Sequence, residues 1–158
     1  MIKIRKGTLK DILQIKECLI DSWVDHAKHE PELLDEERMR KSDIEGYYKK
    51  VFEDSETSFL IVAEIDGEFA GFQRVDIQEI PNFFKYNKIL YLDDAYVLPK
   101  FRRNGIGTLL IREAEKIAKQ NKIKRLQGRV YTFNKPVQKL LARLGYKSPH
   151  ATWDKVID

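Results

Sequence analysis

Basic residues and two glycines meet where a strand-like run of the sequence gives way to a helix-like one. The stretch reads Pro99-Lys-Phe-Arg102-Arg103-Asn-Gly105-Ile-Gly107, and Arg112 follows it. The first amides of a helix have no partner inside the helix, the helix dipole makes that end positive, and glycine lets a bulky phosphate approach the backbone. The pattern therefore suits a site for an anion such as a phosphate group.

Known nucleotide motifs do not explain this loop. It lacks both the Gly-Lys-Ser/Thr of a nucleotide P-loop and the three-glycine spacing of a dinucleotide fold. On spacing alone, a tight strand-to-helix turn with a solvated basic edge accounts for the residues equally well.

The elements on either side of the loop can be predicted from composition and periodicity. Residues 90–98 are rich in aromatic and branched side chains, and Pro99 stops the run because proline has no amide for a strand ladder. Apolar residues then recur at helical spacing: Ile106, Leu109, Leu110, Ala114, Ile117 and Ala118. We therefore expect a strand, the basic loop, and a helix whose free amides point into the loop.

Two motifs together resemble those of a known superfamily. Val97-x-Pro99 followed by Arg102-x-x-Gly105-x-Gly107 resembles the acetyl-CoA signature of the GNAT N-acetyltransferases. The segment from Asn134 to Gly145-Tyr146 resembles that superfamily's Asn, helix, Gly-aromatic element. Tyr91-Leu-Asp93-Asp94 is similar to the corresponding strand of diamine and polyamine acetyltransferases. The resemblance covers residues 2–147, and its motifs are specific for the superfamily but not for the acceptor.

The resemblance implies an α+β fold in a single domain, residues 1–158. The expected sheet is mixed and mostly antiparallel, with six to seven strands, helices on both faces and a splayed parallel strand pair. The sequence pattern places strands at 2–5, 59–65, 69–80, 90–98, 125–131 and 151–157. It places helices after Thr8, over 35–52, from 106 onward and over 134–145.

Several short signals fix the ends of these elements. Thr8 and Asp11 have the spacing of a capping box. Asp66-Gly67 predicts a two-residue hairpin turn. Asn134 can cap the last helix, with Pro136 in its first turn and Gly145 closing it.

Length and composition predict a globular protein of one domain. The chain has 158 residues, of which 42% are hydrophobic and 34% charged. No apolar run approaches the ~20 residues that a membrane span needs, and the start has no signal sequence, so we expect a cytoplasmic protein without membrane contact. The single cysteine, Cys18, excludes an internal disulfide.

Charge is distributed unevenly along the chain. Residues 100–150 contain 14 Lys and Arg against two acids, whereas residues 21–58 contain 12 acids against six bases. A nucleic-acid binder would not be expected to divide this way, so we expect no nucleic-acid partner. The division suits a phosphate-rich cofactor on the second half and a cationic acceptor on the first, although solvated helix faces explain many of the charges.

The resemblance implies acetyl-CoA as co-substrate and a set of residues that hold it. The pantetheine arm would pair with the backbone of Tyr96, Val97 and Leu98, and the Val97 amide would polarise the thioester carbonyl. The amides of Arg103, Asn104, Gly105, Ile106, Gly107 and Thr108 would hold the pyrophosphate, with charge from Arg102 and Arg103. Asn134 matches the position that contacts the cofactor near its thiol end.

The acceptor amine must lose a proton before it attacks. An alkylamine has a pKa of about 10.4, so reaching the neutral form at pH 7 costs about 4–5 kcal/mol. Asp93 matches the carboxylate that serves as base in the polyamine enzymes, and Asp94 follows it. Neighbouring strand residues point to opposite faces, so both can face the acceptor only if the strand bulges between them. The alternative role for either is a bond to backbone or to an arginine.

One position departs from the superfamily pattern. Many members carry a tyrosine that protonates the departing thiolate where this sequence has Leu141. The resemblance implies direct transfer, so Cys18 is not expected to be a nucleophile. The general acid is left unassigned among Tyr86, Tyr131 and Tyr146.

The resulting hypothesis is an acetyl-CoA-dependent N-acetyltransferase acting on the primary amine of a cationic small molecule, a polyamine or an aminoglycoside-like compound. A protein or peptide N-acetyltransferase and a non-catalytic CoA-binding regulatory module are the alternatives. Superfamily members often pair, so the chain could form a homodimer. His26 and His29 lack a third well-placed ligand, and we expect no metal site. Phe83, Phe84 and Tyr86 either cap the edge of the core or wall the acceptor site.

Overall fold

The computed structural model describes residues 1–54 and 56–157, and the chain divides into two compact units. The first comprises residues 1–19 and 43–129, and the second residues 20–42 and 130–158. The elements, in order, are β1 (Ile2–Lys6), the 3-10 turn η1 (Leu9–Asp11), α1 (Ile12–His29), α2 (Glu36–Arg40), α3 (Ile44–Glu53), β2 (Ser58–Ile65), β3 (Glu68–Glu79), β4 (Lys88–Val97), the 3-10 turn η2 (Pro99–Phe101), α4 (Ile106–Gln120), β5 (Leu126–Gly128) and α5 (Lys135–Arg143).

The first unit contains a five-stranded sheet in the order β1-β2-β3-β4-β5. Neighbouring strands are antiparallel from β1 to β4, while β4 and β5 are parallel because α4 connects them. The mixed, mostly antiparallel sheet is confirmed, but the predicted six to seven strands are wrong. Among the described residues the sheet has five strands.

The missing strand and the shortened one lie in the last third of the chain. Residues 151–157 form no strand, and Trp153 is 93% exposed there, so the apolar side chains of this segment have no face on which to be buried. The strand predicted over 125–131 is confirmed only at Leu126–Gly128. Its other residues carry strand-like side chains without forming a ladder.

The helix predicted over 35–52 is two helices, α2 and α3. The break comes at Asp43, whose carboxylate accepts a hydrogen bond from the amide of Gly46 at 2.9 Å. An aspartate at this position begins a new helix more favourably than it continues an old one. The apolar periodicity runs through both helices, so it could not show the break.

Three of the short local signals are confirmed. The amide of Thr8 donates to the Asp11 carboxylate at 2.7 Å. Asp66 and Gly67 both have positive φ, 52° and 86°, as the two-residue hairpin turn requires. The side chain of Asn134 caps α5 by accepting from the amide of Val137 at 3.4 Å.

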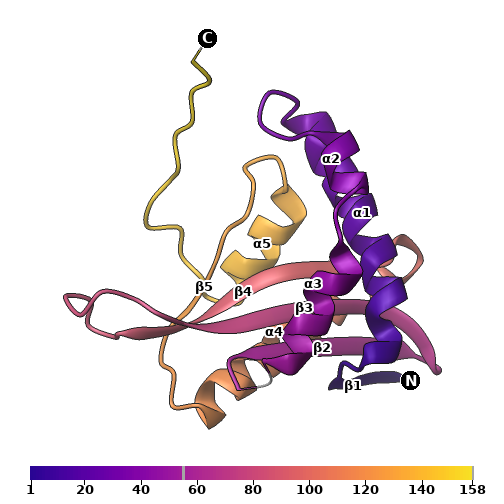
Figure 1. Ribbon diagram of the computed structural model, residues 1–158. Helices are drawn as coiled ribbons and strands as arrows, with labels where there is room; N and C mark the ends of the chain where they lie inside the picture. Colours follow the sequence, from indigo (N-terminus) through magenta and orange to yellow (C-terminus); the bar gives the residue numbers. More distant parts are fainter. Residues whose placement is uncertain (55, 158) are drawn as a thin grey trace. The chain divides into compact units, whose positions relative to one another are not determined.

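Helices cover both faces of the sheet in the first unit, as predicted. Figure 1 shows α3 crossing in front of the strands and α4 behind them. Each helix turns its apolar side inward, Tyr48 and Val51 from α3 and Leu110 and Ala114 from α4, all of them buried. This packing holds β3 and β4, which carry the candidate site, as the rigid centre of the unit.

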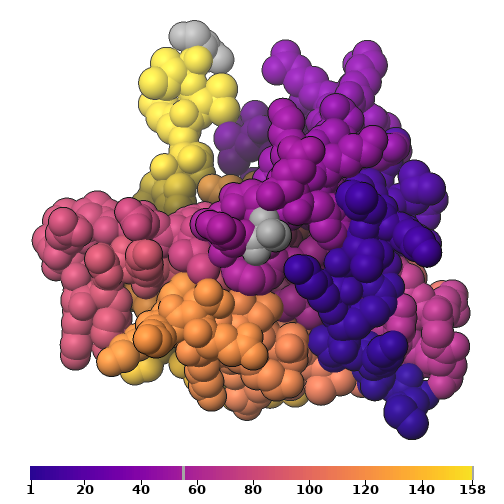
Figure 2. Space-filling view, turned by 60° about the horizontal axis from the view of Figure 1, so that its bottom comes forward, coloured from indigo at the N-terminus to yellow at the C-terminus, as the bar shows by residue number. Residues whose placement is uncertain are grey.

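The hairpin that joins β3 and β4 extends away from the rest of its unit and forms the pink lobe at the left of Figure 2. Its aromatic residues do not cap the core, because Phe83 is 83% exposed and Phe84 is 42% exposed. Instead Phe83 and Phe84 contact each other, with ring centroids 4.8 Å apart. In the described part of the chain, no helix has both the length and the apolar character needed to cross a membrane.

Candidate functional site

The parallel strands β4 and β5 are paired over only three residues. Leu90, Tyr91 and Leu92 lie opposite Leu126, Gln127 and Gly128, and the ladder ends there. β4 continues for five more residues to Val97 while it stays paired with β3. Within the described residues, the outer edge of β4 from Asp93 to Val97 therefore has no β5 partner.

Val97 turns its amide toward this open edge. The next amide, that of Leu98, donates to the carbonyl of Ala70 on the β3 side at 3.0 Å. Residue pairs in an antiparallel ladder alternate between hydrogen-bonded and non-hydrogen-bonded. Leu98–Ala70 is a hydrogen-bonded pair, so the next pair, Val97–Gly71, is non-hydrogen-bonded, and the N–H and C=O of each residue point away from the partner strand. The amides of Tyr96 and Leu98 therefore face β3, and that of Val97 faces outward.

The basic loop turns the chain from β4 into α4 through two residues with left-handed backbone. Arg103 has φ of 67°, and Gly105, the residue before the helix, has φ of 79°. Among the residues that the structure describes, no side chain caps α4. Its first amides, from Ile106, Gly107 and Thr108, are therefore left for an external acceptor, and a left-handed residue just before a helix forms a concave group of amides.

Arg102 ties this loop back to the end of β4. Its Nε donates to the carbonyl of Val97 at 2.9 Å, and its guanidinium lies 5.2 Å from the centre of the Tyr96 ring. Asn104 stays within the loop, where its side-chain amide donates to the carbonyl of Phe101 at 3.3 Å. The open edge of β4, the basic loop and the start of α4 thus follow one another along the chain, and Arg102 joins the loop to the end of β4.

A β-bulge lies at the base of the open edge. Gln73 is opposite Ala95 and Val75 is opposite Leu92, so two residues of β4, Asp93 and Asp94, face the single residue Arg74 of β3. A bulge of this kind turns two successive side chains toward the same side. The condition under which both aspartates could share a face is therefore met.

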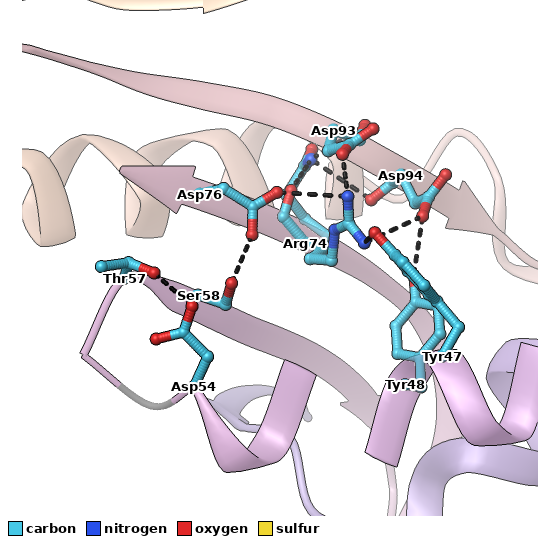
Figure 3. A network of polar contacts seen from close by, with 10 residues as sticks. Tyr47, Tyr48, Asp54, Thr57, Ser58, Arg74, Asp76, Asp93 and Asp94 are labelled. Atoms are coloured by element: carbon cyan, nitrogen blue, oxygen red, sulfur yellow. Dashed lines mark hydrogen bonds and ion pairs between the residues drawn. The ribbon is translucent and has the colours of Figure 1, made fainter. Parts of the chain in front are cut away.

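The carboxylates of both aspartates lie beside the buried guanidinium of Arg74, as Figure 3 shows. Arg74 is 5% exposed. Its Nη2 donates to Asp93 and lies 3.2 Å from Asp76, and its Nη1 donates to the hydroxyl of Tyr47. Asp94 is farther, 3.9 Å from Nη1. Three carboxylates surround one cation, so the cluster of Arg74, Asp76, Asp93 and Asp94 has an excess of negative charge.

Asp94 has a second neighbour besides Arg74, and that neighbour is a hydroxyl group. The hydroxyl of Tyr48, which rises from α3, donates to Asp94 Oδ2 at 2.9 Å. Burial raises the pKa of Asp94, and the charge of Arg74 and the Tyr48 hydrogen bond act against that rise without cancelling it. Burial also raises the pKa of Tyr48 well above its ordinary value, so its hydroxyl remains a donor.

Gln73 supplies the donor that the bulge requires. The bulge takes backbone carbonyls out of the regular ladder, and buried carbonyls need partners. The side-chain Nε2 of Gln73, which is 4% exposed, donates to the carbonyl of Arg74 at 2.8 Å and lies 3.3 Å from that of Asp94. The residue therefore holds the shape that presents the two aspartates.

The residues that surround the aspartates were not predicted from the sequence, namely Tyr47, Tyr48, Gln73, Arg74 and Asp76. One signal was present. Gln73-Arg74 interrupts the apolar run from Phe69 to Val75, and polar residues in the middle of a buried strand require partners. The identity of those partners was not readable, because Tyr48 lies 46 positions from Asp94.

Other predicted residues belong to the second unit, whereas Tyr86 lies in the first. The side-chain oxygen of Asn134 caps α5, and Leu141 lies within α5. Tyr131 packs on Phe133 with ring centroids 5.5 Å apart. His29 stacks on Phe133 at 4.2 Å, and His26 and His29 each direct Nδ1 to a backbone carbonyl of α1, those of Ser22 and Asp25.

A sequence model of the Acetyltransferase (GNAT) family matches residues 16–146. An uncharacterised N-acetyltransferase of Archaeoglobus fulgidus is 36% identical over 75 residues, which are 48% of this chain and 50% of that protein. A streptothricin acetyltransferase of Streptomyces lavendulae is 29% identical, over 60% of this chain and 47% of that protein. The chain thus spans about half the length of these relatives.

Solved structures share the fold at low sequence identity. A protein described as a predicted acetyltransferase, from Clostridium acetobutylicum with acetyl-CoA, has a TM-score of 0.76 at 18% identity, covering 99% of this chain and 96% of that one. An aminoglycoside N-acetyltransferase in complex with CoA has a TM-score of 0.76 at 16% identity, covering 99% and 95%.

Proposed function

This chain belongs to the Acetyltransferase (GNAT) family, and from that membership we propose that it transfers an acetyl group from acetyl-CoA directly to a primary amine. The observation that carries the proposal is the open edge of β4. The strand ends its pairing with β5 at Leu92 but runs on to Val97, whose outward amide is followed at once by the basic loop and the uncapped start of α4.

The proposed cofactor fits this surface from one end to the other. The pantetheine arm, which is extended and contains amides, would take the place of the missing strand beside β4, with the thioester carbonyl accepting a hydrogen bond from the Val97 amide. The pyrophosphate would accept hydrogen bonds from the amides of Gly105 to Thr108. The positive end of the α4 dipole and the charge of Arg103 would also stabilise it. Arg102 holds the end of β4 in place by donating a hydrogen bond to the carbonyl of Val97.

The proposed reaction combines acyl transfer with two proton transfers. A carboxylate of the Asp93–Asp94 pair takes one proton from the ammonium of the acceptor, and the freed amine attacks the acetyl carbonyl. The carbon–sulfur bond then breaks and its electron pair leaves with the thiolate, while the Val97 amide stabilises the negative charge on the carbonyl oxygen of the intermediate. One of the two protons still on nitrogen then passes to the sulfur, which gives the amide and the CoA thiol.

The proposed acceptor is a cationic small molecule of the polyamine or aminoglycoside class. The excess of negative charge in the cluster of Arg74, Asp76, Asp93 and Asp94 favours a cation at the base of the open edge. The streptothricin and aminoglycoside acetyltransferases among the similar proteins support a small-molecule amine. We assign no general acid, because the tyrosine usual in the family is Leu141 here.

Acetyl-CoA binding tests the cofactor site. Gly105→Val would place a branched side chain where the phosphates approach, and we expect at least a tenfold loss of affinity by calorimetry. Gly67→Val is the matched control, because Gly67 also has positive φ and open space around its Cβ but lies at the β2–β3 turn. Equal affinity of the two variants would refute the site.

Turnover tests the reaction and its acceptor. We expect release of CoA thiol from acetyl-CoA with polyamines or aminoglycosides and little release with amino acids or peptides. Preference for peptides would indicate a protein N-acetyltransferase. Tight acetyl-CoA binding without turnover on any amine would indicate a CoA-binding regulatory module and would refute the proposed activity.

A further inference from the structure

The two adjacent carboxylates of the bulge have different environments. Asp93 is bound directly by Arg74 Nη2, the guanidinium nitrogen that also lies 3.2 Å from Asp76. Asp94 lies 3.9 Å from Arg74, which is beyond hydrogen-bond distance, and its partner is the neutral hydroxyl of Tyr48. One carboxylate is therefore held by a charge and the other by a neutral donor.

These environments suit different roles. A carboxylate bound to a guanidinium is stabilised in its ionised form and would lose that bond if it took a proton. A carboxylate held by a hydroxyl keeps its orientation while its proton affinity is set mainly by burial. Burial raises the pKa of Asp94, which brings it closer to the range that a general base needs at neutral pH.

Resting on the acetyl-transfer function proposed above, we infer that Asp94 takes the proton of the acceptor amine and that Tyr48 is the residue that positions it. Asp93 is committed instead to the ion pair with Arg74. The division of roles depends on the bulge, because without the extra residue the two side chains would point to opposite faces of β4.

The position of Tyr48 makes it a fixed reference for the base. Its side chain is fully buried, and its ring packs edge-on against Phe72 of β3 with centroids 6.3 Å apart. A ring held on several sides cannot follow the carboxylate if that group moves, so the hydroxyl defines where Asp94 Oδ2 lies. The titratable and charged groups around Asp94 are Tyr47 and Tyr48 from α3, Arg74 and Asp76 from β3, and Asp93 from β4.

The decisive variant is Tyr48→Phe, which removes the hydroxyl and keeps the ring. The Tyr48 bond stabilises ionised Asp94, so its loss raises the pKa of that carboxyl. We expect the titration midpoint of the Asp94 carboxyl, followed by carbon-13 NMR, to rise by about one pH unit. Tyr47→Phe is the matched control, because its hydroxyl accepts from Arg74 and makes no bond to Asp94, and the midpoint should move by less than a third as much.

The pH dependence of kcat/KM connects this titration to the reaction. Activity falls on the acid side as the base becomes protonated, so the acid limb should move to higher pH by the same amount in Tyr48→Phe. Asp94→Asn should abolish the limb and lower kcat at least a hundredfold with little change in KM. Asp93→Asn keeps an oxygen that Arg74 can bind but removes a negative charge next to Asp94. The loss of that charge lowers the pKa of Asp94, so the acid limb of this variant should remain and move to lower pH.

The outcomes separate this inference from the proposed function. An unchanged Asp94 midpoint in Tyr48→Phe would refute the positioning role, whether or not the enzyme turns over. Two other results would overturn Asp94 as the proton acceptor while acetyl transfer stands. One is a shifted Asp94 midpoint in Tyr48→Phe with an unshifted rate profile. The other is an acid limb that is lost in Asp93→Asn and kept in Asp94→Asn. Absence of turnover in the wild-type protein with every amine would instead refute the proposed function.

Discussion

Arg102 donates from Nε to the carbonyl of Val97 at 2.9 Å, which joins the basic loop to the last residue of β4. The bond occupies the carbonyl that follows the outward amide of Val97, and the Tyr96 ring lies under the same guanidinium. One side chain thus fixes both the end of the open strand edge and the start of the turn that leads to α4.

Replacing Arg102 with alanine should weaken acetyl-CoA binding more than removing another charge from the same loop. Lys100→Ala is the control, since Lys100 lies in the same basic segment but pairs with Glu68 of β3, whereas Arg102 binds the end of β4. We expect about a tenfold rise in Kd for Arg102→Ala and at most threefold for Lys100→Ala, measured by calorimetry at constant salt. Equal losses would mean that only the charge of the loop matters.

Asp11 should make the stability of the first unit depend on pH. Burial alone would raise the pKa of Asp11, but hydrogen bonds from Arg5 and Thr8 outweigh it and the pKa is lowered. A carboxyl whose pKa is lowered by folding contributes stability above its ordinary pKa and loses it as the pH falls toward the lowered value. Urea unfolding between pH 7 and pH 3 should therefore show a steeper loss for the wild-type protein than for Asp11→Asn.

At pH 7 the Asp11→Asn change should cost about 2–3 kcal/mol of unfolding free energy, because it leaves Arg5 and the Thr8 amide poorly paired. Asp66→Asn is the control, because the Asp66 side chain is 77% exposed and asparagine suits the same turn. A change within about 0.5 kcal/mol is expected there. A flat difference between wild type and Asp11→Asn across the pH range would contradict the assignment.

Gly71 should be required by the close approach of β4. A Cβ at Gly71 would lie 2.5 Å from the carbonyl oxygen of Tyr96, which is backbone and cannot rotate away. Gly71→Ala should therefore cost about 1–3 kcal/mol in urea unfolding. Gly128→Ala offers a graded comparison, since its Cβ would lie 3.0 Å from the carbonyl oxygen of Leu92, and it should cost less. The reverse order would show that β4 can move away from β3 at little cost.

Asp43 should matter only as the cap that begins α3. Asp43→Ala removes the acceptor of the Gly46 amide and should cost about 1 kcal/mol. Asp43→Asn keeps a side-chain oxygen at the same place and should cost a few tenths of that. If both variants lose the same stability, the negative charge of Asp43 rather than its hydrogen bond starts the helix.

The sequence by itself determined the local elements that support the site. The run that ends at Pro99, the glycines at the start of the next helix, the Asp66-Gly67 turn and the caps at Thr8 and Asn134 are all readable, because each depends on residues a few positions apart. Strands were less predictable, and fewer form within the described residues than the sequence pattern indicates. Strand-like residues at 151–157 form no ladder, because a strand requires a partner that its own residues do not specify.

Only the tertiary structure decided which groups the two aspartates contact. The bulge that turns both toward one side is a register shift between β3 and β4, and register is a property of the pair of strands. Arg74 reaches Asp93 across 19 positions, and Tyr48 reaches Asp94 across 46. A carboxylate's proton affinity depends on its buried neighbours, and those neighbours come from elements that meet only when the chain has folded.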